Sequence, residues 1–296
     1  MSVKWLEASV ETDNETSEAV LEVFSRYASR RVIIEAGPGG WNTGQVIVRA
    51  YLRADEQLGD RKRCVEESFW HLRQIGPVSE LSFHPVAEAD WTKVRRKRLK
   101  VLRVGCVVIR PPWLEHTPVS GEIVVQLDCK ASFGAGLHPT TQMCLLALEK
   151  LVHPEVQMLD LGTGTGILAI AAAKQRAGRV LAMDKDSTAI AMARENVARN
   201  GVRNKVSLAC GTLADVSESY DLVVVNILTK AIVKMAQQGL AERVRPGGRL
   251  IASGILADQE PEVAAALEQA SFDLVERRQM GDWVCLIAKR RDLPDR

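Results

Sequence analysis

One stretch, residues 156–186, constrains the fold of this chain more than any other. It reads VQMLDLGTGTGILAIAAAKQRAGRVLAMDKD. An apolar segment is followed by a glycine-rich turn, an alanine-rich helix and a second apolar segment that ends in Asp184. This order predicts a strand–helix–strand unit of a nucleotide-binding sheet. In such a unit the turn presents backbone N–H groups to a ligand, and the acidic residue after the second strand can hold a ribose.

The spacing of the glycines narrows the choice of ligand. Gly162, Gly164 and Gly166 form G-x-G-x-G, whereas the dinucleotide fingerprint is G-x-G-x-x-G with a helix N-terminus aimed at a pyrophosphate. Asp160 precedes the turn, where a carboxylate repels phosphate but suits a cationic ligand. S-adenosylmethionine has an ammonium, a sulfonium and a ribose and no phosphate, so we expect it as cofactor, with Asp184 on the ribose. The alternative is a structural glycine turn with Asp184 as a helix N-cap.

Length and composition set further limits. A chain of 296 residues predicts two domains, and a net charge of +2 gives no global argument for binding nucleic acid or membrane. We expect no signal peptide and no membrane span, because no apolar run is long enough. The six cysteines form no C-x-x-C pair and no cluster with histidine. This is typical of reduced thiols in a cytoplasmic protein without a structural metal.

Residues 1–87 predict a small α+β domain. Their hydrophobic periodicity indicates the order βαββαβ, which is typical of a ferredoxin-like domain. The predicted strands cover 4–12, 31–36, 46–52 and 81–86, and the predicted helices cover 16–29 and 55–74. Because this segment has no glycine loop and no obvious catalytic cluster, we interpret it as a recognition module.

A charged connector follows at residues 88–103, where seven residues are Lys or Arg. Two interpretations are open: a solvated helix face, or a patch for an acidic or RNA-bound partner. No periodic aromatic residues accompany the charges, so a stacking surface for nucleic acid is not supported.

The remainder predicts a parallel sheet with an antiparallel final strand, because strands and helices alternate. After two short strands at 104–110 and 122–128, His138 and Pro139 open a helix. Asp160, Asp184 and Asn226 all fall at carboxyl ends of predicted strands, where ligands of such sheets bind. The later strands are predicted at 205–210, 220–225, 249–253, 272–279 and 283–289, and the helices at 187–200, 229–244 and 259–270.

Four motifs, in this order, resemble the ribosomal protein L-eleven methyltransferase (PrmA) family. They are FGAGLHPTT at 133–141, DLGTGTG at 160–166, DLVVVNIL at 221–228 and SGIL at 253–256. The resemblance covers nearly the whole chain. It implies a Rossmann-like class I S-adenosylmethionine-dependent methyltransferase domain preceded by a small ferredoxin-like α+β domain. The expected boundaries are 1–87 for the recognition domain, 88–103 for the connector and 104–296 for the methyltransferase domain.

The resemblance also implies roles for individual residues. In the family the glycine loop and the acidic residue bind the cofactor, which corresponds to Gly162, Gly164 and Asp184, with Asp160 beside them. A loop over the cofactor implicates Phe133 and Thr141. The asparagine after the fourth strand becomes Asn226, expected both to touch the cofactor and to serve catalysis. The sequence departs from the usual family pattern at Ala135, Leu137 and Thr229, which leaves the identity of the target open.

The chemistry expected is transfer of a methyl group to the lysine side-chain amines, and the N-terminal amine, of a large-subunit ribosomal protein. The amine must be neutral, and burial beside a sulfonium lowers its pKa, so no dedicated base is obligatory. The Asn226 oxygen can accept an amine hydrogen bond, and the Phe133 ring can stabilise the methylated cation. His138 is either a base, or a loop anchor or helix cap.

Two other functions stay open at this stage. The chain can be a lysine methyltransferase of a different protein, or a non-catalytic assembly factor that binds the cofactor. The presence of Asn226 favours an enzyme, because a protein that only binds the cofactor does not need an asparagine at this position. We expect a cytoplasmic monomer with a protein substrate, with no membrane partner and with nucleic acid involved only indirectly.

Overall fold

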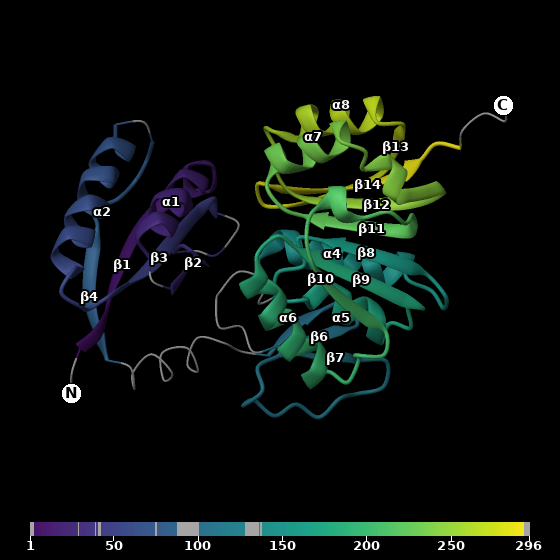
Figure 1. Ribbon diagram of the computed structural model, residues 1–296, viewed down its shortest axis with the longest axis horizontal. Coiled ribbons are helices and arrows are strands. Elements are labelled where there is room, and N and C mark those ends of the chain that lie inside the picture. Colours follow the sequence, from purple (N-terminus) through teal and green to yellow (C-terminus); the bar gives the residue numbers. More distant parts are fainter. Residues whose placement is uncertain are drawn as a thin grey trace. The chain divides into compact units, whose positions relative to one another are not determined.

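The computed structural model describes most of the chain: residues 3–28, 30–38, 40, 43–74, 76–87, 101–127, 136 and 138–292. The described residues divide into two compact units, one before residue 88 and one from residue 101 onwards (Figure 1). Most of the predicted connector, residues 88–100, lies outside the described residues. Within the described residues, no helix is long and apolar enough to cross a membrane.

The first unit is a four-stranded sheet with two helices. Its elements are β1 (Val3–Asp13), α1 (Asn14–Tyr27), β2 (Arg30–Ala36), β3 (Gln45–Arg53), α2 (Leu58–Leu72) and β4 (Ser82–Ala87). The strand order is β2-β3-β1-β4 and every neighbouring pair is antiparallel. Asp13 begins α1 by accepting the N–H of Thr16, as expected of an aspartate N-cap.

Both helices of the first unit cover the same face of its sheet. Alternate residues of β1 and β3, such as Ala8 and Val48, are buried together with Phe24 of α1 and Phe69 of α2. The two phenylalanine rings lie 4.6 Å apart between centroids. This core explains the hydrophobic spacing in the sequence, since successive strand residues point to opposite faces.

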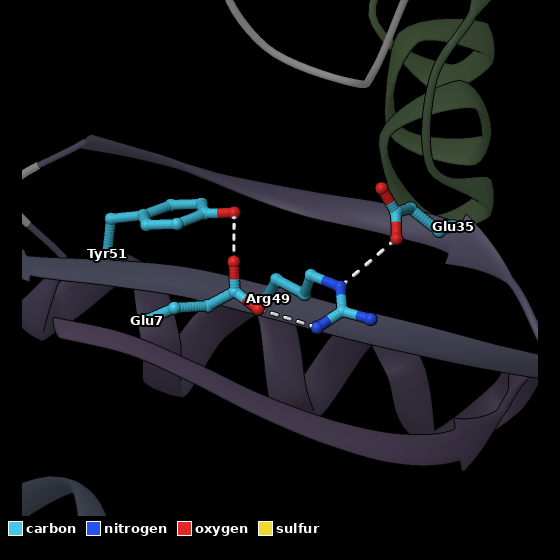
Figure 2. Close-up of polar contacts among 4 residues, drawn as sticks. All are labelled: Glu7, Glu35, Arg49 and Tyr51. Atoms are coloured by element: carbon cyan, nitrogen blue, oxygen red, sulfur yellow. Dashed lines mark hydrogen bonds and ion pairs between the residues drawn. The ribbon is translucent and has the colours of Figure 1, made fainter. Parts of the chain in front are cut away.

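The other face of this sheet carries a partly buried network of charged and polar residues (Figure 2). The Glu7 carboxylate accepts a hydrogen bond from the Tyr51 hydroxyl at 2.6 Å and another from Arg49 Nη1 at 2.6 Å. Arg49 Nε donates to Glu35 at 3.0 Å. These contacts join β1, β3 and β2, and Glu7 lies directly opposite Tyr51. Charge-assisted hydrogen bonds of this kind fix the register of the strands.

The second unit contains a seven-stranded sheet with the order β10-β9-β8-β11-β12-β14-β13. Its strands are β8 (Gln157–Leu161), β9 (Arg179–Asp184), β10 (Val206–Cys210), β11 (Tyr220–Asn226), β12 (Val244–Leu256), β13 (Phe272–Met280) and β14 (Trp283–Arg290). The first five strands in spatial order are parallel, and β14 is antiparallel to both of its neighbours. The α/β class and the mixed sheet predicted from the sequence are therefore confirmed.

Helices cover both faces of this sheet. They are α4 (Pro139–Leu151), α5 (Ile167–Lys174), α6 (Ser187–Arg199), α7 (Thr229–Gln237) and α8 (Glu260–Gln269). Ile232 of α7 and Val263 of α8 share one core with Leu159 and Leu161 of β8. Helices α4, α5 and α6 pack on the opposite side (Figure 1). From β8 the chain builds the sheet first in one direction, through β9 and β10, and then in the other, through β11 and β12. Ligands of such sheets bind at the carboxyl ends of the strands around this point of reversal.

The prediction of one strand over 104–110 is wrong. The segment forms two strands, β5 (Leu102–Val104) and β6 (Val107–Arg110), which pair with β7 (Ile123–Gln126) in a separate three-stranded sheet. Gly105 has a φ of 55°, a left-handed conformation that glycine adopts without strain. The turn is also held by Glu149, which accepts the N–H of Cys106 at 3.2 Å.

The helix predicted over 229–244 is too long. Helix α7 ends at Gln237, and Gly239 has a φ of 96°, which a continuing helix does not permit. A single helical turn at Ala241–Arg243 then leads into β12. That strand begins at Val244, five residues before the predicted start at 249. RPGG lies where the pairing with β11 shifts register between Val244 and Arg249, and Gly247 has a φ of 71°, so the predicted turn is an irregular part of the strand.

Candidate functional site

The glycine turn joins β8 to α5 and is tied to the neighbouring strand. Gly162, Gly164 and Gly166 have φ values of 78°, 55° and 82°, which favour glycine over residues with a side chain. The N–H groups of Gly162 and Thr163 donate to the Met183 carbonyl at 2.8 and 2.9 Å. Three glycines are therefore needed for the backbone path itself, and the turn lies beside the end of β9.

Asp184 is the last residue of β9, and its carboxylate faces the turn. One oxygen accepts the N–H of Gly164 at 2.9 Å, and the other accepts the N–H of Asp186 at 3.0 Å. A Cβ atom at Gly164 would meet no heavy atom within 4 Å, so there is room beside the turn. The N-cap of α6 is Asp186, which accepts the N–H of Thr188 at 2.8 Å. The alternative interpretation of Asp184 as that cap is therefore wrong.

Asp160 lies inside the protein and is 1% exposed. Its carboxylate accepts the Thr163 hydroxyl at 2.6 Å and also a hydrogen bond from the backbone N–H of Ala169, in α5. Burial raises the pKa of Asp160 to about 6, and the hydrogen bonds from Thr163 and Ala169 oppose that shift. The contacts of this residue thus join the end of β8 to the turn and to α5. The predicted contact of Asp160 with a cofactor stays a prediction.

His138 is the N-cap of α4. Its Nδ1 lies 3.3 Å from the Thr140 backbone nitrogen and 2.8 Å from Thr140 Oγ1. The ring nitrogen therefore accepts the backbone N–H in the first turn of this helix. The ring packs edge-on against Trp283, with 4.6 Å between centroids. Burial lowers the pKa of His138 to about 3, which makes it a neutral and very weak base at neutral pH. The structure supports the cap and anchor interpretation over that of a catalytic base.

Asn226 ends β11 and meets the first turn of α4. Its Nδ2 donates to Thr141 Oγ1 at 3.4 Å, and Thr141 is 3% exposed. The contact uses the nitrogen of the amide and not its oxygen. The structure thus brings together two of the predicted residues from segments 85 positions apart. Phe133, predicted for the same site, lies outside the described residues.

Ile227 is a part of the site that the sequence interpretation missed. A Cβ atom at Gly162 would lie 2.5 Å from Ile227 Cγ2, and one at Gly254 would lie 2.1 Å from the Ile227 carbonyl oxygen. Gly254 also has a φ of 91°. Ile227 therefore passes between the two glycines with no space for a side chain on either. The glycines of the DLGTGTG and SGIL motifs were the available signal, since glycine marks close approach of backbone.

This arrangement defines the class. A doubly wound sheet with a glycine turn after β8, an acidic residue at the end of β9 and an asparagine at the end of β11 defines a Rossmann-like methyltransferase domain of class I. The family model described as ribosomal protein L11 methyltransferase (PrmA) matches residues 4–291. The chain belongs to this family, and the resemblance stated from the motifs is confirmed.

Individual relatives agree with this assignment. A ribosomal protein L11 methyltransferase of Chloroflexus aurantiacus is 38% identical over 328 aligned positions, which cover 98% of this chain and 99% of the relative. One from Bacillus pumilus is 33% identical and covers 97% of this chain and 100% of the relative. The crystal structure of a ribosomal protein L11 methylase from Lactobacillus delbrueckii subsp. bulgaricus is 34% identical, with a TM-score of 0.60 over 64% of this chain and 97% of that one.

Proposed function

We propose that this protein transfers methyl groups from S-adenosylmethionine to amines of ribosomal protein L11, with lysine side chains and the N-terminal amine as the acceptors. The observation that carries the proposal is the placement of Asp184, the glycine turn and Asn226 at the carboxyl ends of adjacent strands. Membership of the family, with relatives of the same name along the full chain, supports the protein substrate.

The residues around the turn suit this cofactor, which supplies a methyl group activated by a sulfonium. A carboxylate is an acceptor only, so Asp184 is suited to the two hydroxyl donors of a ribose. Its oxygens are already directed by the N–H groups of Gly164 and Asp186. The open side of Gly164 gives the ligand access to the turn. Gly162 is packed against Ile227. This glycine therefore serves the course of the backbone and leaves no space for the ligand.

The acceptor amine needs a neutral lone pair, whereas a free lysine has a pKa of about 10.4. His138, with a pKa of about 3, is too weak a base to remove that proton. The proton therefore leaves to solvent, helped by burial of the ammonium beside another cation. Asn226 then positions the amine: its Nδ2 is held by Thr141, and its amide oxygen accepts an N–H of the acceptor. Transfer depends on this alignment because the displacement is in line.

Residues 1–87 are proposed as the module that captures the protein substrate, with the connector ending before residue 101 and the catalytic domain following it, so that β5 (Leu102–Val104) is not divided. Two observations support this division: the described residues before 88 form a compact unit with its own core, and the predicted site residues that are described all lie in the other unit. Because β5 begins at Leu102, a fragment for testing the division starts at residue 101. This fragment is expected to bind the cofactor but not to methylate intact L11.

The test of the function is a methylation assay with the whole protein, S-adenosylmethionine labelled in its methyl group and purified L11, followed by peptide mass spectrometry. We expect label on lysines and on the N-terminal residue of L11. A parallel assay with a lysate from cells that lack this activity separates the alternatives. Label on a band of another mass would identify a different protein substrate, and binding of the cofactor without any labelled band would indicate a non-catalytic factor.

A further inference from the structure

One face of α6 carries an unusual pair of asparagines. Ala193, Asn196 and Asn200 are spaced by three and four residues, so they lie on the same side of the helix. Asn196 is 0% exposed. Asparagine is a poor helix former, and burying an amide is unfavourable unless it is hydrogen-bonded. A buried asparagine in the last turn of a helix therefore requires a specific partner.

The partner of Asn196 belongs to the glycine turn. Asn196 Nδ2 donates to the backbone carbonyl of Thr165 at 2.9 Å, and Arg199 donates to the amide oxygen at 3.0 Å. Thr165 immediately precedes Gly166, the N-cap of α5. A Cβ atom at Gly166 would lie 3.3 Å from the Ala193 Cβ, so α6 and the turn are in close contact. One asparagine thus anchors the second half of the turn.

Asn200 holds a different segment. Its Oδ1 accepts the N–H of Gln126 at 2.9 Å, and its Nδ2 donates to the Gln126 carbonyl at 2.7 Å. The side-chain amide therefore pairs with the backbone of Gln126 as a neighbouring strand would. Nδ2 also lies 2.9 Å from the Asn196 carbonyl, which links the two asparagines. Gln126 is the last residue of β7, so the C-terminal end of α6 fixes the end of that strand.

The other end of α6 is connected to the same turn. Asp184 accepts the N–H of Gly164 and that of Asp186, which caps α6. The helix is therefore linked to two successive residues of the turn: to Gly164 through Asp184, which lies before the first residue of α6, and to Thr165 through Asn196 in its last turn. A displacement of α6 at its C-terminal end is transmitted to the turn that faces the ligand.

We propose that Asn196 and Asn200 are positioning residues for the cofactor site, which act by fixing α6 against the glycine turn and against β7. The proposal rests on the proposed function, because it assigns a ligand to the turn. Asn196 is buried and contacts the turn through the Thr165 carbonyl. Its loss lets the backbone at Gly164 and Gly166 move, so that the N–H of Gly164 and the Asp184 carboxylate are no longer held in one arrangement.

The experiment compares full-length variants. Asn196→Leu and Asn196→Asp are close in size to asparagine but lack the N–H donor, and Asn200→Ala removes both bonds to Gln126. Val197→Ala, at a buried neighbour in the same helix turn, is the control for a general loss of stability, because it removes no hydrogen bond to the glycine turn. Arg194→Ala, on the exposed side of α6, is the surface control. Each is measured for S-adenosylmethionine affinity by calorimetry, for KM and kcat, and for amide hydrogen exchange at Gly164 and Gly166.

Both Asn196 variants are expected to weaken cofactor binding about tenfold, equivalent to about 1.4 kcal/mol. Asn200→Ala is expected to weaken it about threefold and also serves where an Asn196 variant does not fold. The KM for cofactor should rise while the KM for L11 and kcat at saturating cofactor stay within twofold. Amide exchange at Gly164 and Gly166 should quicken in the asparagine variants and not in Val197→Ala.

Two results would overturn the proposal. One is exchange at Gly164 and Gly166 that is unchanged in the asparagine variants. The other is a loss of affinity in Val197→Ala equal to that in the Asn196 variants. That result would show that the loss of affinity follows from lower stability of the fold in general. Failure of the proposed function is seen separately, as wild-type protein that does not bind S-adenosylmethionine or does not label L11. The exchange measurement tests the anchoring of the turn even in that case.

Discussion

The carboxylate of Asp184 accepts the backbone N–H of Gly164 at 2.9 Å. This contact joins the acidic residue at the end of β9 to the middle glycine of the turn, two features that the sequence places 20 residues apart. The acid is therefore oriented by the turn and does not cap the following helix. The same contact places a negative charge beside the open side of Gly164, where a bound ligand can reach both groups.

The first prediction concerns that carboxylate. Asp184→Ala removes a charge-assisted acceptor, a contact of about 1.5–3 kcal/mol. The affinity for S-adenosylmethionine, measured by calorimetry, should therefore fall roughly 10- to 150-fold. Asp186→Ala is the matched control, because it removes the cap of α6 and should lower stability with a smaller effect on affinity. Tight binding of NAD by the wild-type protein, without a response to S-adenosylmethionine, would contradict the ligand assignment.

The second prediction concerns the partly buried network of Glu7, Arg49, Tyr51 and Glu35 in the first unit. Glu7→Gln removes the charge that Arg49 and Tyr51 share, and Glu7 is only 7% exposed. The local free energy of opening, read from amide exchange in β1 and β3, should fall by about 1.5–3 kcal/mol. Glu22→Gln breaks the exposed ion pair with Arg26 and should change it by less than about 0.5 kcal/mol. Equal effects of the two substitutions would show that the network has no special role.

The sequence predicted best the features that have local signals. The strand–turn–helix–strand unit around the glycine turn is marked by glycines that need positive φ and by Asp184 at the end of the strand. The starts of α4 and α6 are marked by a pre-proline histidine and by Asp186. These signals lie within a few residues of the structure that they specify, so periodicity and turn chemistry are sufficient to find them.

What the sequence did not predict depends on contacts between distant segments. The turn at Gly105 divides an apolar run that reads as one strand. Ile227 fits between Gly162 and Gly254, and Asn196 reaches Thr165, through contacts that only the folded sheet creates. Asp160 was expected to face a cationic ligand because it precedes the turn. Its hydrogen bonds with Thr163 and Ala169 became evident only once α5 was placed beside β8.

The third prediction is a pH dependence set by Asp160. Its pKa of about 6 in the folded protein lies above the ordinary value of 3.8 because of burial, so between these pH values the folded state binds more protons than the unfolded chain. Stability from this group therefore falls as the pH rises from about 4 to about 6. Asparagine does not titrate, so the unfolding free energy of Asp160→Asn minus that of wild type should rise by about 2 kcal/mol across this range.

Asp215 provides the control for the direction of this pH dependence. Hydrogen bonds from Thr212 lower the pKa of Asp215, so this group stabilises the fold at higher pH and loses that contribution as the pH falls. Because this change occurs below the ordinary pKa of 3.8, denaturant titrations of Asp215→Asn are extended down to about pH 3. Their difference from wild type should fall, not rise, with increasing pH between about pH 3 and pH 5. A difference for Asp160→Asn that stays constant from pH 4 to pH 7 would contradict the assignment of a raised pKa.

The fourth prediction concerns Asn226, which we expect to serve methyl transfer more than cofactor affinity. Alanine there cannot accept the N–H of the incoming amine, and loss of alignment should lower the single-turnover rate roughly 100-fold or more. The cofactor dissociation constant, measured on the same preparation, should change by less than about tenfold. Thr141→Val removes the hydroxyl that holds the Asn226 amide nitrogen, so it should lower the rate in the same direction by a smaller factor. If Asn226→Ala reacts at the wild-type rate in a single turnover, Asn226 has no part in positioning the amine, and its contact with Thr141 serves only to join β11 to α4.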